Sequence, residues 1–212
     1  MQQFDHFVLA APDLQEAKQA FAELSGCMPA DGGAHKGLGT HNALCSFGPE
    51  SYLEIVAPDP QQALDNPITR YLAGLPHATP LHWAIRSDDL QDVAQRALDL
   101  GISPGPIRAT TRAQPDGTEL NWQLMGLGPQ ELGGLVPFFI DWLDCPHPAT
   151  TTPVAGTVRA FTVSLPAGPL QEVLKGTSGV EISSGQPGLS LTVDSAKGEI
   201  SWQTERAQGF TL

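Results

Sequence analysis

The stretch Phe4-Asp5-His6-Phe7-Val8-Leu9 decides the fold, because the chain contains it twice. Residues 81–85 (LHWAI) repeat it, and the two histidines, at positions 6 and 82, are separated by 76 residues. The same offset carries residues 13–15 (DLQ) onto residues 89–91 (DLQ). A strand and the helix that follows it are therefore duplicated in register, and each copy carries a histidine at the same place. That shared position makes the two histidines joint candidates for a functional site.

The composition fits one or two globular domains and limits the partners that the protein can have. The chain has 212 residues, of which 41% are hydrophobic, so a normal core can form. A net charge of −12 argues against nucleic acid and anionic membrane surfaces, since both require Lys and Arg. No apolar stretch approaches the ~20 residues of a membrane span, and the apolar run at 7–11 is too short for a signal peptide. We therefore expect a small-molecule ligand, with no nucleic-acid partner and no membrane.

The cysteines and the glycine-rich segment exclude several kinds of site. Cys27, Cys45 and Cys145 are too few and too far apart for a disulfide framework or a zinc motif, which favours a reducing cytoplasm. Residues 28–42 are rich in glycine but contain no GK[ST] and no strand-GxGxxG-helix order, so we expect no nucleotide cofactor. We expect this segment, which carries His35 and His41, to be a mobile loop.

Each copy predicts a strand, a helix and then antiparallel strands. Asp13 is the expected N-cap of the first helix, which Gly26 ends. Residues 104–117, which hold Arg112, are expected to form an irregular loop. Further strands are predicted at 42–47, 52–56, 120–125 and 136–142, and a short helix at 68–74.

Composition and offset also divide the chain into modules. We predict module one at residues 1–75 and module two at 76–145, joined to an accessory module (156–212) by a linker rich in Pro and Thr (146–155). An offset of 156 carries residues 14–16 onto 170–172, but it carries His6 onto a threonine. The third module therefore repeats the pattern weakly and lacks the histidine.

Alternation along the strands separates an apolar face from a polar one. It places Asp5, Phe7 and Leu9 on one face of the first strand and Phe4, His6 and Val8 on the other. We expect an α+β fold, in which tandem βαβββ modules form a curved-sheet cup with helices outside, followed by a smaller C-terminal β-rich module. Two imidazoles and the Glu54 carboxylate inside the cup need a partner to offset their desolvation, and a divalent metal would provide it.

The opening strand and the residues after it (Pro12-Asp13-Leu14) resemble the start of proteins of the vicinal-oxygen-chelate superfamily, which contains glyoxalase I, extradiol dioxygenases and bleomycin-resistance proteins. Residues 39–44 (GTHNAL), 52–54 (YLE) and 137–140 (PFFI) are similar to its glyoxalase-like domain branch. The resemblance covers residues 4–145, and the tail is similar to an extra module of that branch.

The resemblance implies paired βαβββ modules that hold a metal in a cup. Carried over to this chain, it makes His6, Glu54 and His82 metal ligands, and aligning residues 52–55 on 139–142 makes Asp141 the fourth. Asp is one methylene shorter than the Glu that is more usual in the family, so a site of two histidines, one glutamate and water is an alternative. Mn, Fe, Ni or Zn would suit these ligands.

Other candidates are weighed from their positions. His41 is a candidate general base together with Glu54, and Arg112 is a candidate clamp for a substrate carboxylate or phosphate. Tyr52 and Phe139 share the strand parity of the predicted ligands and are candidate substrate contacts, although both also suit a core.

Two functions follow from these observations. The first is a divalent-metal-dependent enzyme that acts on a small substrate with vicinal oxygens, as an isomerase, a lyase or a ring-cleaving dioxygenase. The second is a non-catalytic binding or sequestering protein that resembles the bleomycin-resistance branch. Two modules in one chain can complete a cup, so a monomer and a homodimer are both allowed.

Overall fold

The computed structural model describes residues 1–62, 65–113 and 119–204, which form an α+β fold with two sheets. Among these residues, no helix has the length and apolar character needed to cross a membrane. In chain order the helices and strands are β1 (Gln3–Ala10), α1 (Leu14–Ser25), β2 (Ala30–His35), β3 (Thr40–Ser46), β4 (Tyr52–Pro58), α2 (Pro67–Ala73), β5 (Thr79–Arg86), α3 (Leu90–Asp99), β6 (Arg108–Ala113), β7 (Glu119–Met125), η1 (Gln130–Leu135), β8 (Phe138–Asp141), η2 (Pro148–Thr150), β9 (Gly156–Leu165), α4 (Pro169–Leu174), β10 (Glu181–Ser184), β11 (Gly188–Ser195) and β12 (Gly198–Thr204).

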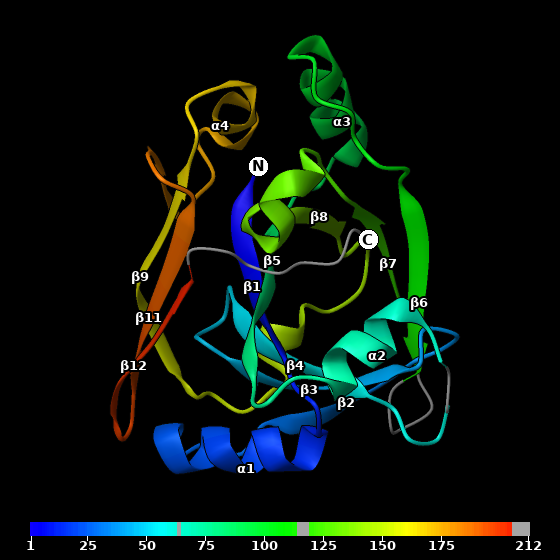
Figure 1. Cartoon of the computed structure of the whole chain (residues 1–212), viewed down its shortest axis with the longest axis vertical. Helices are drawn as coiled ribbons and strands as arrows, with labels where there is room; N and C mark the ends of the chain where they lie inside the picture. Colours follow the sequence, from blue (N-terminus) through cyan, green and yellow to red (C-terminus); the bar gives the residue numbers. More distant parts are fainter. Residues whose placement is uncertain (63–64, 114–118, 205–212) are drawn as a thin grey trace.

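The larger sheet has eight strands in the order β2-β3-β4-β1-β5-β8-β7-β6 and curves into a nearly closed cup (Figure 1). β1 runs parallel to β4, and β5 runs parallel to β8, so each module places its first strand beside its last. β1 and β5 pair in antiparallel orientation and join the two modules. The predicted tandem βαβββ cup is confirmed.

Local sequence signals position the two outer helices. The carboxylate of Asp13 accepts a hydrogen bond from the backbone N–H of Glu16 (2.9 Å), and that of Asp89 accepts one from Asp92 (2.9 Å). Each bond satisfies a backbone donor that the first turn of a helix leaves unpaired. Gly26 ends α1 with φ +80°, a conformation that L side chains rarely adopt.

The two faces of the large sheet differ in what covers them. Phe7, Leu53 and Trp83 are fully buried on the convex face, where they form one core with buried residues of α1 and α3. The concave face carries a second apolar cluster that includes Val8, Tyr52 and Leu72 of α2, and this cluster lies inside the cup.

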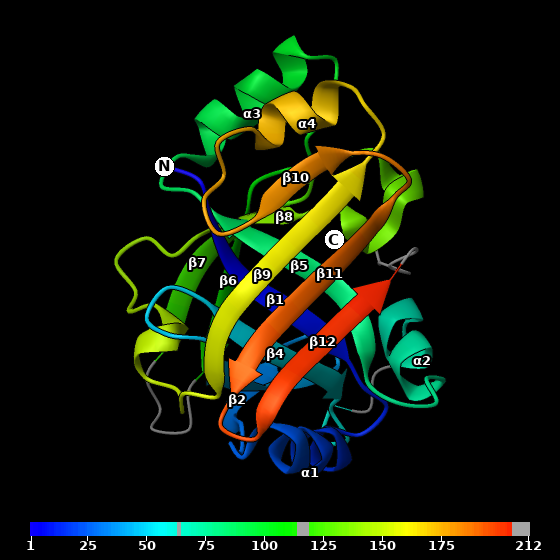
Figure 2. The ribbon, with the colours of Figure 1, turned by 90° about the vertical axis from the view of Figure 1, so that its left-hand side faces the viewer.

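The C-terminal module forms a four-stranded sheet in the order β10-β9-β11-β12, which lies across β1 and β5 (Figure 2). Phe161 of β9 places its ring 4.7 Å from that of Phe4 and 5.1 Å from that of Trp83, centroid to centroid. The module therefore covers the convex face that α1 and α3 leave open. The division into domains stays a prediction, since the core is continuous across both sheets.

Two segments that we expected to be loops contain strands. Residues 30–35 form β2, which pairs with β3, and residues 108–113 form β6, which pairs with β7. Both are edge strands, and an edge strand needs backbone hydrogen bonds on one side only. Their polar and glycine-rich sequences therefore lack the apolar alternation on which the expectation depended.

Candidate active site

A β-bulge in the first strand builds the centre of the site. Phe4 pairs with Ile85 and His6 with Ala84, so Asp5 lies between them without a partner on β5. A bulge of this kind re-aims the side chains next to it. Asp5 therefore turns to the same side as His6, while Phe4 joins the convex core. The predicted alternation was wrong at these two residues, because strict period two ignores the extra residue.

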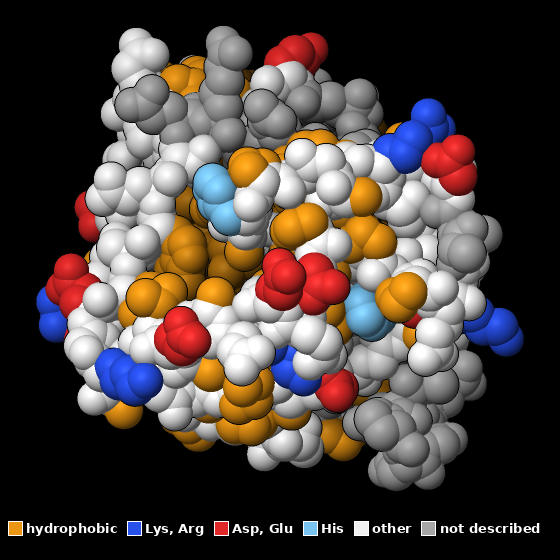
Figure 3. Space-filling model, turned by 60° about the horizontal axis from the view of Figure 1, so that its bottom comes forward, with side chains coloured by type: hydrophobic (Ala, Val, Ile, Leu, Met, Phe, Trp, Pro, Cys, Tyr) orange, Lys and Arg blue, Asp and Glu red, His pale blue; other side chains and the backbone are white. Residues whose placement is uncertain are grey.

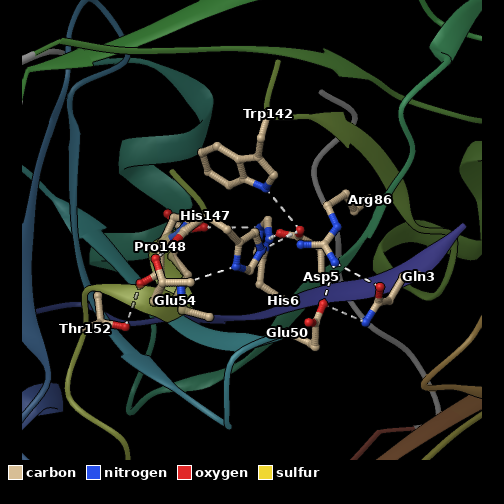
Figure 4. Close-up of polar contacts among 12 residues, drawn as sticks. Gln3, Asp5, His6, Glu50, Glu54, Arg86, Trp142, His147, Pro148 and Thr152 are labelled. Carbon is tan, nitrogen blue, oxygen red and sulfur yellow. Dashed lines mark hydrogen bonds and ion pairs between the residues drawn. The ribbon is translucent and has the colours of Figure 1, made fainter. Parts of the chain in front are cut away.

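Asp5 is fully buried and accepts three hydrogen bonds. Its Oδ1 lies 2.5 Å from His6 Nδ1, and its Oδ2 accepts from Trp142 Nε1 (3.0 Å) and lies 2.9 Å from His147 Nε2 (Figure 4). Burial alone would raise the pKa of Asp5, but the hydrogen bonds to His147 and His6 outweigh it and hold the pKa well below its ordinary value. Asp5 is therefore a carboxylate, and a carboxylate can only accept hydrogen bonds.

His6 is held by this carboxylate on one side and by two aromatic rings. The ring of Tyr52 stacks on the imidazole at 4.5 Å, and the ring of Phe138 meets it edge-on at 5.3 Å. Because the Asp5 carboxylate accepts a hydrogen bond from Nδ1–H, the lone pair of neutral His6 lies on Nε2. That nitrogen is 3.6 Å from Oε2 of Glu54.

Asp5, His6 and Glu54 form a line of contacts, and Glu54 is the member of this line that reaches solvent. Its side chain is 14% exposed, against 2% for His6 and none for Asp5. Asn42 Nδ2 donates to Glu54 Oε1 at 2.7 Å, and His35 Nε2 lies 3.6 Å from the same oxygen. Glu54 is therefore fixed from two neighbouring strands, with one oxygen directed at His6 and the other at the Asn42–His35 pair.

His82 and the second module contribute a different arrangement. His82 Nδ1 faces the backbone of Trp83, 3.1 Å from its nitrogen and 3.2 Å from its oxygen. Burial lowers the pKa of His82 to about 4, so the ring is neutral at pH 7. The ring of Phe138 meets His82 edge-on at 5.1 Å, as it meets His6 from the other side. Phe138 therefore contacts both imidazoles.

The structure does not bring the other predicted residues into this group. Asp141 pairs with Gln123, and its Oδ1 accepts from the backbone N–H of Leu143 (2.8 Å), which closes a turn. His41 is the neighbour of Asn42 on β3. Because side chains alternate between the two faces of a strand, His41 points away from Glu54.

The predicted substrate contacts lie at three different places. Tyr52 is inside the cup against His6, whereas Phe139 is fully buried in the convex core. The side chain of Arg112 lies outside the part of the chain that the structure describes. Substrate binding by these residues stays a prediction.

A metal held by both modules does not fit these side chains. His6 Nε2 and Glu54 Oε2 are close enough to share an ion, but Phe138 lies against both histidines and Asp141 closes its own turn. Within residues 1–62, 65–113 and 119–204, no three His, Cys, Asp or Glu side chains form a group that could hold a metal ion. Metal binding stays a prediction of the family resemblance.

Several residues of the site were not predicted from the sequence, namely Asp5, His35, Asn42, Trp142 and His147. Only Asn42 could have been found from the sequence. It lies two residues from Leu44 on β3, so strand alternation places both side chains on the inner face. His35 was expected on a loop, and His147 reaches Asp5 from across 142 residues of sequence. Their roles depend on tertiary contacts that no local pattern encodes.

One face of the molecule is hollowed and mixed in charge (Figure 3). On the face shown in Figure 3, hydrophobic side chains gather in a hollow beside a histidine, and Lys and Arg lie singly around it. A groove of about 990 Å³ lies between module two and the third module. It is lined by His82, Phe138 and three loop segments, residues 101–106, 126–133 and 166–170.

Comparison with known proteins identifies the fold. A model of the glyoxalase-like domain family matches residues 4–172. A hypothetical protein from Staphylococcus aureus has a similar structure, with a TM-score of 0.64 over 88% of each chain and 14% sequence identity. No curated protein sequence matches the chain.

Two solved epimerases are also similar in part. Methylmalonyl-CoA epimerase from Mycobacterium tuberculosis gives a TM-score of 0.49 over 66% of this chain and 88% of its own, at 18% identity. A variant of the Streptomyces coelicolor enzyme, in complex with 2-nitronate-propionyl-CoA, gives 0.48 over 66% and 96%, also at 18% identity. At such identities these likenesses concern the fold alone.

Proposed function

We propose that this chain, which belongs to the glyoxalase-like domain family of the vicinal-oxygen-chelate superfamily, is an enzyme that transfers a proton on a small substrate with neighbouring oxygen atoms. Glu54 is the proposed base. The observation that supports this role is the position of Glu54, a partly exposed carboxylate at the end of the buried Asp5–His6 pair. A general base must meet the substrate while its partners stay fixed.

Each residue of the line has a defined part in the proposed step. Glu54 takes a proton from the carbon next to a substrate carbonyl, and the electron pair of that C–H bond moves onto the carbonyl oxygen as an enolate. Glu54 then returns the proton on the same face to the neighbouring carbon, while the hydroxyl proton of the first carbon moves to the other oxygen, so the product is an isomer. His6 Nε2 can hold a proton for Glu54, because Asp5 stabilises the imidazolium that forms.

The walls of the cup support this chemistry by excluding water. Val8, Tyr52 and Phe138 are buried around His6 and Glu54 and offer apolar surface. A low-polarity surround strengthens the electrostatic interactions of the carboxylate with its partners. Asn42 fixes the orientation of Glu54 through the 2.7 Å hydrogen bond.

No step of this proposal uses a metal, since the predicted ligands of the two modules do not gather at one place. A second function, ligand binding without catalysis, is favoured by a separate observation. The concave cluster gives the inside of the cup many apolar side chains, and an apolar cup suits a binding protein.

Solvent exchange distinguishes the two functions. Hydroxyacetone and dihydroxyacetone, which carry a carbonyl beside an oxygen-bearing carbon, are incubated with the protein in D2O, and the loss of C–H signals is followed by ¹H NMR. The wild type is expected to accelerate exchange. Glu54→Gln keeps the shape of the side chain without the base, so its rate should fall by about 10²–10⁴-fold.

Glu50→Gln is the matched control, because Glu50 is an exposed carboxylate that pairs with Arg86 at 2.7 Å outside the cup. Its exchange rate should equal that of the wild type. Equal thermal stabilisation of wild type and Glu54→Gln by these compounds, with no exchange in either, would contradict the enzyme and support the binding protein.

A further inference from the structure

The duplication shows which residue of module two stands where Glu54 stands in module one. In module one, His6 is followed two residues later by Val8, and Val8 pairs with Glu54 on the parallel strand β4. In module two, His82 is followed two residues later by Ala84, and Ala84 pairs with Phe138 on the parallel strand β8. Phe138 is therefore the positional equivalent of Glu54. Asp141 lies three residues further along β8.

The surroundings of Phe138 agree with this register. Its ring meets His6 at 5.3 Å and His82 at 5.1 Å, so it occupies the inner surface between the two histidines. The side chain is 7% exposed and belongs to the concave cluster. A carboxylate at this position would face both imidazoles and would complete a set of two histidines and two carboxylates.

The ring nitrogens of His82 and His6 have different partners. Asp5 orients the His6 ring from a buried position, whereas His82 Nδ1 contacts the backbone of Trp83. His82 and Phe138 also line the groove of about 990 Å³ between module two and the third module. The two histidines share a place in the repeat but not the same function in the cup.

We propose that Phe138 occupies the place where a second-module carboxylate would complete a duplicated metal site, so that His82 does not bind a metal together with His6 and Glu54. Because Phe138 has no polar group, the reactive side chains that the structure describes inside the cup come from module one alone. This inference does not depend on the proposed role of Glu54 as a base.

Restoring the carboxylate tests the inference. Untagged wild type, Phe138→Glu and Phe138→Leu are stripped with chelator, incubated separately with MnCl2, NiCl2 and ZnCl2, passed over a desalting column and assayed for bound metal. Phe138→Glu is expected to retain about one ion per chain and to gain thermal stability from it. Phe138→Leu removes the ring without adding a ligand, so it should retain no more metal than the wild type.

Removing His82 shows which side chains hold the ion. The double variant Phe138→Glu/His82→Ala should lose the metal that Phe138→Glu gains. A folded Phe138→Glu protein that retains no metal would overturn the inference. So would a wild type that retains about one ion per chain and loses it in His82→Ala. This last comparison uses no substitution at Phe138, so it can overturn the inference even if Phe138→Glu does not fold.

Discussion

Asp5 is the residue that gives the site its order. It is fully buried, and its two oxygens accept hydrogen bonds from His6, its neighbour on β1, and from Trp142 and His147 in the segment after β8. A buried charge is costly unless hydrogen bonds compensate it, and here the pKa of Asp5 stays below its ordinary value because the bonds are present. The same bonds fix the ring of His6, so stability and function depend on one carboxylate.

Replacing Asp5 tests this dependence. Asp5→Asn keeps the shape but removes the charge, and we expect it to lower the free energy of unfolding at pH 7 by about 3 kcal/mol. Because the pKa of Asp5 is lower in the folded state than in the unfolded state, its contribution is fully present above the ordinary carboxyl pKa and is lost as the pH falls from there through the folded-state pKa. The difference between wild type and variant in urea unfolding should therefore narrow below pH ~4.

Asp144→Asn is the control for this measurement, since Asp144 is exposed. It should change the unfolding free energy by less than about 0.5 kcal/mol at either pH. An Asp5→Asn protein as stable as the wild type at pH 7 would contradict the assigned hydrogen bonds.

At the scale of elements, the parts of the fold that the sequence predicted are those with local signals. The caps at Asp13 and Asp89 and the glycine at position 26 place α1 and α3 where they were expected. The bulge at Asp5 has no such signal, because it arises from the pairing of β1 with β5. Strict alternation therefore predicted the face of His6 and missed the residue that orients it.

The caps themselves can be measured. Asp13→Ala and Asp89→Ala each remove the acceptor for a backbone N–H of the first helical turn, and each should cost about 1 kcal/mol of stability. Asp88→Ala, next to the second cap and exposed, should cost less than about 0.5 kcal/mol. Thermal unfolding of the three variants under one set of conditions provides the comparison. Equal losses at Asp88 and Asp89 would show that the cap assignment is incorrect.

At the scale of the whole molecule, the third module completes the burial of the convex face of the duplicated sheet. The two outer helices cover only part of the convex face, and the sheet of β9–β12 covers Phe4, Phe7 and Trp83. The 156-residue offset indicates this module only weakly, since its strands keep the apolar pattern but not the histidine. Tertiary packing, which a single sequence does not display, decides where such a module lies.

Phe161 is the residue through which this packing can be tested. Its ring contacts those of Phe4, Phe7 and Trp83, so Phe161→Ala should destabilise the protein by about 3–5 kcal/mol. Thr157→Ala, on the same strand but exposed, is expected to have little effect. Chemical unfolding monitored by tryptophan fluorescence measures both. A loss of similar size in the two variants would show that the β9 sheet does not form one core with the cup.

The arrangement Asp5–His6–Glu54 is tested most directly by locating the proton on His6. Long-range ¹H–¹⁵N NMR of histidine-labelled protein distinguishes a protonated ring nitrogen from an unprotonated one, and the His6 signals are assigned by their loss in His6→Gln. With His6 neutral, the proton should reside on Nδ1, against Asp5, and Nε2 should be unprotonated toward Glu54. A neutral His6 with its proton on Nε2 would contradict the ionised Asp5 and the line of proton transfer built on it.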